Sequence, residues 1–147
     1  MKFTVKIDET AEESVIVTVN KKNSFVDDIE ALVRNYSGDN ELTVFVDNEF
    51  RKLSLDDIEC IFVTGSKTEV ISFEGKHYFL KERLYEVEDR LPGYFIRINK
   101  SAIANERAIQ RFKTDFGGGV SVEFKCGYCD YVSRRCFAEI KRRFKKK

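Results

Sequence analysis

Short segments in which apolar and polar residues alternate dominate this chain, and they constrain its fold more than any other feature. In Val120–Lys125, for example, Val120, Val122 and Phe124 alternate with polar neighbours. A period of two places successive side chains on opposite faces of a strand. Similar segments recur between turn residues, at 42–46, 50–53, 59–64, 69–73, 76–80, 95–98, 108–114 and 128–132. The sequence therefore predicts a mainly β protein, α+β overall, with antiparallel strands joined by tight turns.

Residues 1–41 are predicted to form a separate β-β-α extension, followed by a second unit over residues 42–147. Lys2–Asp8 and Ser14–Asn20 both alternate, which predicts two strands. A helix is expected from Ser24, because apolar residues then recur at helical spacing, at Phe25, Ile29, Leu32, Val33 and Tyr36. From the residues alone, this extension could mediate dimerisation, bind an inhibitor or complete the core.

The charges are split along the chain. Residues 1–93 carry 12 Lys and Arg against 20 Asp and Glu, a net charge of −8. Residues 94–147 carry 14 Lys and Arg against 5 Asp and Glu, a net charge of +9. Such asymmetry indicates a polyanionic partner at the basic end, most often nucleic acid.

The chain has the sequence features of a cytoplasmic protein. Its first residues, MKFTVKIDETAEE, are charged throughout and contain no apolar core of a signal peptide. No stretch approaches the roughly 18 apolar residues that a membrane span needs. In that compartment the four cysteines are expected to be reduced thiols.

Little in the sequence indicates catalysis. The single histidine, His77, lies in a predicted strand, and no Ser or Cys has an identifiable base beside it. Gly117–Gly119 precedes an alternating segment, so we expect a hairpin loop there and not a phosphate-binding loop. Cys126 and Cys129 form one C-x-x-C pair, whereas structural zinc sites commonly use two. We expect no enzyme activity, cofactor or metal, although a redox or metal role of this pair stays open.

Two polar, basic segments carry the strongest functional signal. The first, FIRINKSAIAN at Phe95–Asn105, begins as a strand and runs into Asn99, Lys100 and Ser101. The second, YVSRRCFAEIKRR at Tyr131–Arg143, places Ser133, Arg134 and Arg135 where a strand gives way to a helix. These side chains can hydrogen-bond phosphates or base edges, and a helix N-terminus favours a bound phosphate.

These segments resemble the LytTR DNA-binding domain of bacterial transcription regulators. The resemblance rests on F-x-R-x-x-K-S-x-x-x-N within Phe95–Asn105 and on V-S-R-R at Val132–Arg135. Leu55–Ser72 is similar to the opening strands of that domain. The resemblance covers about residues 42–147, and the chain is similar to compact stand-alone members without a receiver domain.

The resemblance implies an elongated arrangement of antiparallel strands whose loops enter successive major grooves of DNA. Three patches are then expected to face DNA, and they comprise Ser66, Lys67, Thr68, Asn99, Lys100, Ser101, Ser133, Arg134 and Arg135. Family members often carry His at the position of Asn99. For Arg97, on the strand, we expect a structural ion pair. The resemblance further implies a homodimer on paired half-sites and suggests a small membrane protein as a partner.

The sequence thus predicts a regulator that binds double-stranded DNA with sequence specificity. The alternative is a protein-interaction module whose basic C-terminal end binds an acidic partner. The two differ in salt dependence, since DNA affinity should fall steeply and log-linearly with salt. A single-stranded RNA binder would expose aromatic side chains on a sheet face, whereas most Phe residues here alternate into the predicted core.

Overall fold

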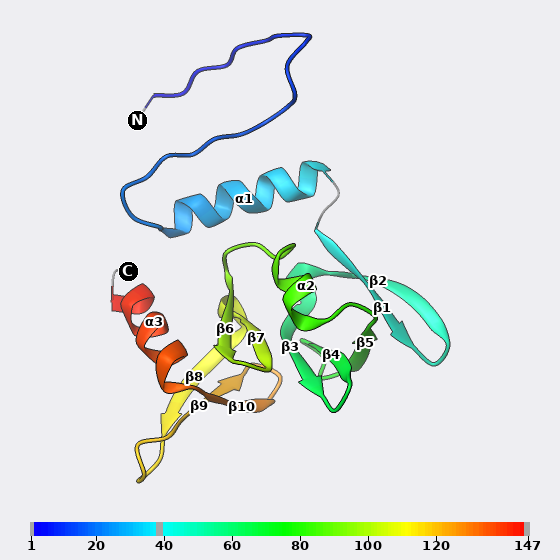
Figure 1. The fold of residues 1–147 in the computed structure, drawn as a ribbon, viewed down its shortest axis with the longest axis vertical. Coiled ribbons are helices and arrows are strands. Elements are labelled where there is room, and N and C mark those ends of the chain that lie inside the picture. Colours follow the sequence, from blue (N-terminus) through cyan, green and yellow to red (C-terminus); the bar gives the residue numbers. More distant parts are fainter. Residues whose placement is uncertain (1, 38–39, 146–147) are drawn as a thin grey trace.

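The larger of two antiparallel sheets forms the centre of the molecule (Figure 1). The computed structural model describes residues 2–37 and 40–145. The strand order of the large sheet is β2-β1-β5-β4-β3-β7-β6. Its strands are β1 (Glu41–Val46), β2 (Glu49–Ser54), β3 (Ile58–Thr64), β4 (Lys67–Ser72), β5 (His77–Leu80), β6 (Phe95–Asn99) and β7 (Ala102–Asn105).

A smaller sheet and the helices complete the fold. The small sheet has the order β10-β9-β8 and consists of β8 (Ile109–Thr114), β9 (Val120–Phe124) and β10 (Cys129–Val132). The helices are α1 (Ser24–Ser37), α2 (Leu84–Glu88) and α3 (Arg134–Lys145). Two single 3₁₀ turns, η1 (Leu55–Asp57) and η2 (Glu106–Ala108), lead into strands β3 and β8. The predicted class, mainly β and α+β overall, is confirmed.

The centre of the large sheet is buried on both faces, at β3 and β7, whereas its edge strand β2 is largely exposed. Ile58 and Ile61 of β3 join one core cluster, which also contains Leu84 and Val87 of α2. Cys60 and Phe62 of the same strand join a second cluster, with residues of β9, β10 and α3. Opposite faces of β3 therefore hold α2 on one side and the small sheet with α3 on the other.

Tight turns occur where the sequence predicts them. Asp47 and Asn48 connect β1 to β2 with positive φ angles of 50° and 63°, the conformation of a two-residue hairpin turn. Gly117–Gly119 lies in the loop between β8 and β9, where the carboxylate of Asp115 accepts from the amides of Gly117 and Gly119. Strand β7, which pairs with both β3 and β6, has no counterpart among the predicted strands.

The prediction of two strands at Lys2–Asp8 and Ser14–Asn20 is wrong for the single chain. Both segments are extended but unpaired, and their apolar side chains face solvent; Phe3 is 90% exposed and Ile7 89%. An isolated two-stranded hairpin is marginal in water without a surface to cover. The helix of the predicted β-β-α extension is confirmed. The side chain of Asn23 caps its N-terminus by accepting a hydrogen bond from the amide of Val26. Residues 38 and 39, near the predicted boundary at 41/42, lie outside the described residues.

Candidate nucleic-acid interface

Arg97 holds the turn between β6 and β7 in place. Its Nε lies 2.7 Å from Oε2 of Glu88, and its Nη1 donates to the main-chain carbonyl of Lys100 at 2.7 Å. The ion pair expected for Arg97 is thus present. Because the guanidinium holds the backbone of the turn, the exposed side chain of Lys100 projects from a rigid support.

Asn99 is part of the same support. It is only 1% exposed, and its amide nitrogen donates to the carbonyl of Tyr131 at 2.8 Å and to Oδ1 of Asp130 at 3.4 Å. Its Oδ1 accepts from the amide of Ser101 at 2.8 Å. Both amide hydrogens and the amide oxygen of Asn99 are engaged within the fold, so this buried side chain positions the turn and is not presented to solvent.

The start of α3 is tied to β6. The amide of Ser133 donates to the carbonyl of Ile98 at 2.8 Å, and its Oγ accepts from the amide of Cys136 at 3.2 Å. Ser133 therefore caps α3 at the junction of strand and helix that the sequence predicts. The next two residues, Arg134 and Arg135, are exposed at the positive end of a twelve-residue helix.

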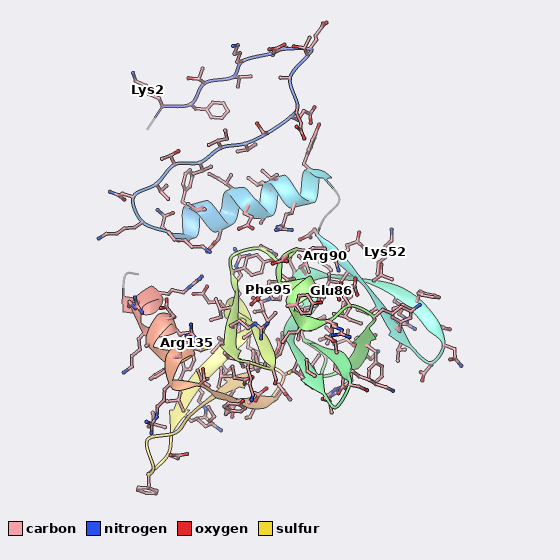
Figure 2. All side chains as sticks on the ribbon, in the orientation of Figure 1. Lys2, Lys52, Glu86, Arg90, Phe95 and Arg135 are labelled. Atoms are coloured by element: carbon pink, nitrogen blue, oxygen red, sulfur yellow. The ribbon has the colours of Figure 1, made fainter. Side chains whose placement is uncertain are left out.

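These two segments border one groove of about 710 Å³ between β6 and α3. Lys100 and Arg135 line it from opposite elements, and apolar residues including Phe95, Ile96 and Ile140 form its floor. In Figure 2, Arg135 lies on α3 and Phe95 lies on β6, nearer the centre of the molecule. The fold therefore joins two of the predicted patches into one basic surface.

The third predicted patch is the turn between β3 and β4. Ser66 and Lys67 are exposed there, whereas Thr68 is 6% exposed and faces the interior of the sheet. Nζ of Lys67 lies 5.1 Å from the centre of the Phe79 ring. The amide of Val63 donates to the carbonyl of Ser101 at 2.9 Å, so this turn is connected directly to the β6–β7 turn.

Several cations of the basic C-terminal third are neutralised within the fold. Arg143 pairs with Glu106 at 2.9 Å, and Arg142 pairs with Glu139 at 2.6 Å. Hydrogen bonds from Lys113 and Arg111 hold the pKa of Glu123 below its usual range. Lys100, Arg134 and Arg135 are exposed and form no ion pair within the described residues, as is also true of Lys125 and Lys141.

Tyr131 is a residue of this surface that the sequence did not single out. It lines the same groove, is 53% exposed and follows Asp130 on β10. Its hydroxyl can donate to a phosphate or a base edge. The alternation of 128–132 predicts a strand, but which face of that strand meets the groove depends on the docking of the small sheet.

The cysteines and the histidine do not assemble a reactive centre in the described ranges. No group of three or more His, Cys, Asp or Glu side chains there could hold a metal ion. Burial raises the pKa of the Cys60 thiol and that of the Cys126 thiol, which disfavours the thiolate. His77 is exposed, with Nδ1 3.3 Å from Oε1 of Glu69.

Residues 2–37 and 40–145 contain no helix that is long and apolar enough to span a membrane.

Comparison with known proteins gives a consistent picture. The family model of the LytTr DNA-binding domain matches residues 48–145. Proteins of Staphylococcus aureus strains N315 and COL, both described as uncharacterized HTH-type transcriptional regulators, are 31% identical over 144 residues, which is 97% of this chain and 97% of theirs.

A solved structure shares the fold. It is the LytTr DNA-binding domain of a protein from Bacillus cereus described as a methyl-accepting/DNA response regulator. The two superpose with a TM-score of 0.65 at 21% identity, over 71% of this chain and 96% of the other.

Proposed function

Because this chain belongs to the LytTR family of DNA-binding transcription regulators, we propose that it reads specific double-stranded sequences through the segments that border the groove between β6 and α3. The observation that carries the proposal is the placement of Lys100 and Arg135. Both are exposed on either side of one groove, and the residues around them are held by Arg97, Asn99 and Ser133.

The chemistry of these side chains suits DNA. Lys100 can bind a phosphate or a guanine edge, and Arg135 can place its forked donors on O6 and N7 of guanine. The amides of Arg134 and Arg135 have no hydrogen-bond partner among the described residues. Together with the positive end of α3, they favour a phosphate at this helix start, beside Ser133. Asn99 supports this surface from within, and we assign it no base contact.

DNA is read by turns and a helix end, not by a recognition helix. In the described residues α2 and α3 are separated by strands β6 to β10, so they do not form a helix-turn-helix pair. The exposed Ser66 and Lys67 of the β3–β4 turn provide a further contact. Thr68 and Ser101, which are less exposed, support Lys67 and Lys100 from the adjacent positions. We propose that these turns enter successive major grooves.

Two copies are proposed to bind as a homodimer on paired half-sites, in the cytoplasm, where bacterial DNA lies. Specific recognition by two copies would account for a regulator with so small a contact surface on each chain. A small membrane protein as antagonist is suggested by the family resemblance alone, and we assign no surface to it.

The experiment is affinity selection by the purified chain on sheared genomic DNA from its own source, at two salt concentrations. Enriched fragments that share two short repeats, one or two helical turns apart, would support a dimeric regulator. Weak enrichment of all fragments that disappears at the higher salt would contradict the proposal and leave only an electrostatic patch.

A further inference from the structure

We propose that residues 2–36 are the pairing surface for a second copy of this chain. The centre of this surface is a stripe on α1 formed by Phe25, Ile29, Leu32 and Tyr36, here called the α1 seam. Lys2–Asp8 and Ser14–Asn20, here called the arm, become paired strands beside it when two copies meet. The inference deepens the proposed function, since it rests on the binding of two copies to paired half-sites.

Exposed apolar side chains are concentrated in this part of the molecule. Of the eighteen large hydrophobic residues that are exposed in the described chain, eleven lie between Phe3 and Tyr36. Neither core cluster contains a residue that precedes Leu42. A single folded chain rarely leaves so many apolar side chains of one segment uncovered, so this segment indicates an interaction site.

Helix α1 is attached to the rest of the molecule by its polar side. Oε2 of Glu30 accepts from the amide of Gly93 at 3.0 Å, and the guanidinium of Arg34 donates to the carbonyl of Arg90. One turn earlier, Asp27 is only 5% exposed against the same loop. The polar residues thus face the DNA-binding domain, which leaves Leu32 at 69% and Tyr36 at 82% exposure on the other side.

The spacing of the α1 seam suits another helix. Its residues follow at steps of four, three and four, which is the alternation that keeps a stripe facing a partner helix. Fourteen residues of helix extend over about 21 Å, enough for two heptads of contact. A second, identical helix related by a two-fold axis presents the same stripe, and self-complementarity of this kind is the usual basis of homodimers.

The arm supports pairing for a separate reason. Phe3, Val5 and Ile7 alternate with polar residues, as do Val15, Val17 and Val19, yet neither segment is paired within the chain. Each leaves a row of unpaired amide and carbonyl groups that can join strands of another copy. Three or more strands with an apolar face are stable where one hairpin is not, and the arms of two copies supply four strands.

Size and charge agree with a second copy as the occupant. A stable interface buries roughly 800 Å² and about 20–30 residues on each partner, which is the scale of a segment with eleven exposed apolar side chains. Residues 2–37 carry 5 Lys and Arg against 7 Asp and Glu, a net charge of −2. Two such surfaces repel each other only weakly, and the surface is unsuited to DNA.

The α1 seam lies away from the β3–β4 turn proposed to contact DNA, although Lys22, which precedes α1, also lines the groove between β6 and α3. In Figure 1, α1 and the arm lie at the end of the molecule opposite the β3–β4 turn. The similarity to the Staphylococcus aureus relatives extends over 144 residues, whereas the DNA-binding family model begins at residue 48. The relatives therefore share a chain segment ahead of the DNA-binding domain.

The test compares full-length chains by analytical ultracentrifugation across the micromolar range. The seam variant combines Leu32→Glu with Tyr36→Glu; the control combines Phe50→Glu with Tyr85→Glu, which are 67% and 60% exposed outside this surface. The wild type and the control are expected to dimerise. In the seam variant the dissociation constant of the dimer should rise by about a hundredfold or more, because four carboxylates would enter one apolar seam.

Three outcomes decide the inference. A wild-type chain that stays monomeric at every concentration, with and without paired-site DNA, would overturn it, as would a seam variant that dimerises like the wild type. Amides of residues 2–20 that exchange at the same rate in dimer and monomer would overturn the assignment of the arm. Binding to a single half-site distinguishes failure of the pairing surface from failure of the proposed DNA-binding function. The seam variant should keep its affinity for a single half-site. Loss of sequence preference in all variants would instead contradict the proposed function.

Discussion

The side-chain amide of Asn99 donates to the main-chain carbonyl of Tyr131 at 2.8 Å, and this bond holds the β6–β7 turn against the strand that leads into α3. Asn99→Ala leaves that carbonyl and the amide of Ser101 without their partner. We expect the free energy of unfolding to fall by about 1–3 kcal/mol, measured by urea denaturation. Lys100→Ala is the matched control on the adjacent residue; it is exposed and should change stability by less than about 0.5 kcal/mol. Equal stability of the two variants would contradict the supporting role of Asn99.

Arg97 should matter more for DNA affinity than for stability. Its partner Glu88 is 41% exposed, and such a pair contributes only about 0–1 kcal/mol. However, the same guanidinium also holds the carbonyl of Lys100. Arg97→Lys keeps the charge but loses the fork that binds both groups. We expect about tenfold weaker operator binding with unchanged binding to unrelated DNA, measured by fluorescence anisotropy; a parallel loss on both DNAs would contradict this role.

The contact of α1 with the domain should weaken as pH rises. Burial raises the pKa of Asp27, only partly opposed by Lys22 and Arg143. Since the docked carboxyl binds its proton more tightly than an exposed one, docking is favoured below the exposed pKa and loses this contribution as pH rises through the docked pKa. Asp27→Asn should therefore stabilise docking at neutral pH and flatten its pH dependence. Hydrogen exchange of α1 amides from pH 4 to 8 checks this; identical profiles for both proteins would contradict it.

Gly93 allows the close approach of α1. A Cβ at this position would overlap the ammonium group of Lys22 and lie 3.1 Å from Oδ1 of Asp27. Because the flexible end of Lys22 can move aside while Asp27 must shift by a few tenths of an ångström, Gly93→Ala should speed the exchange of α1 amides modestly without changing affinity for a single half-site. Combining it with Lys22→Ala should remove part of the effect, because the overlapping group is gone. Additive effects of the two substitutions would show that the overlap is not the cause.

Much of the DNA-binding domain follows from local sequence, and the reasons are visible in particular elements. The hairpin at Asp47 and Asn48 depends on turn residues between alternating segments, so sequence alone predicts it. Strand β7 was missed because its four residues, Ala102–Asn105, are all buried and show no alternation. A strand covered on both faces carries no period of two.

The structure divides the residues predicted to face DNA by their exposure. Lys100, Arg134 and Arg135 lie on the surface, as the resemblance implies, whereas Asn99 and Thr68 face inward. The orientation of these side chains depends on long-range packing. Asn99, for example, is held by the carbonyl of Tyr131, which is 32 positions away in the sequence. At the other end, the alternation of the arm predicted strands for which a single chain supplies no partner.

The most direct test of the account is the affinity of three single variants for one operator selected from genomic DNA. Lys100→Ala and Arg135→Ala should each lose about 1–3 kcal/mol of specific binding and remain folded. Lys52→Ala, which removes an exposed cation from β2 on the side of the molecule away from Arg135 (Figure 2), should bind as the wild type does. If all three bound alike, or if Lys52→Ala lost as much as the other two, the groove between β6 and α3 would not be the surface that reads DNA.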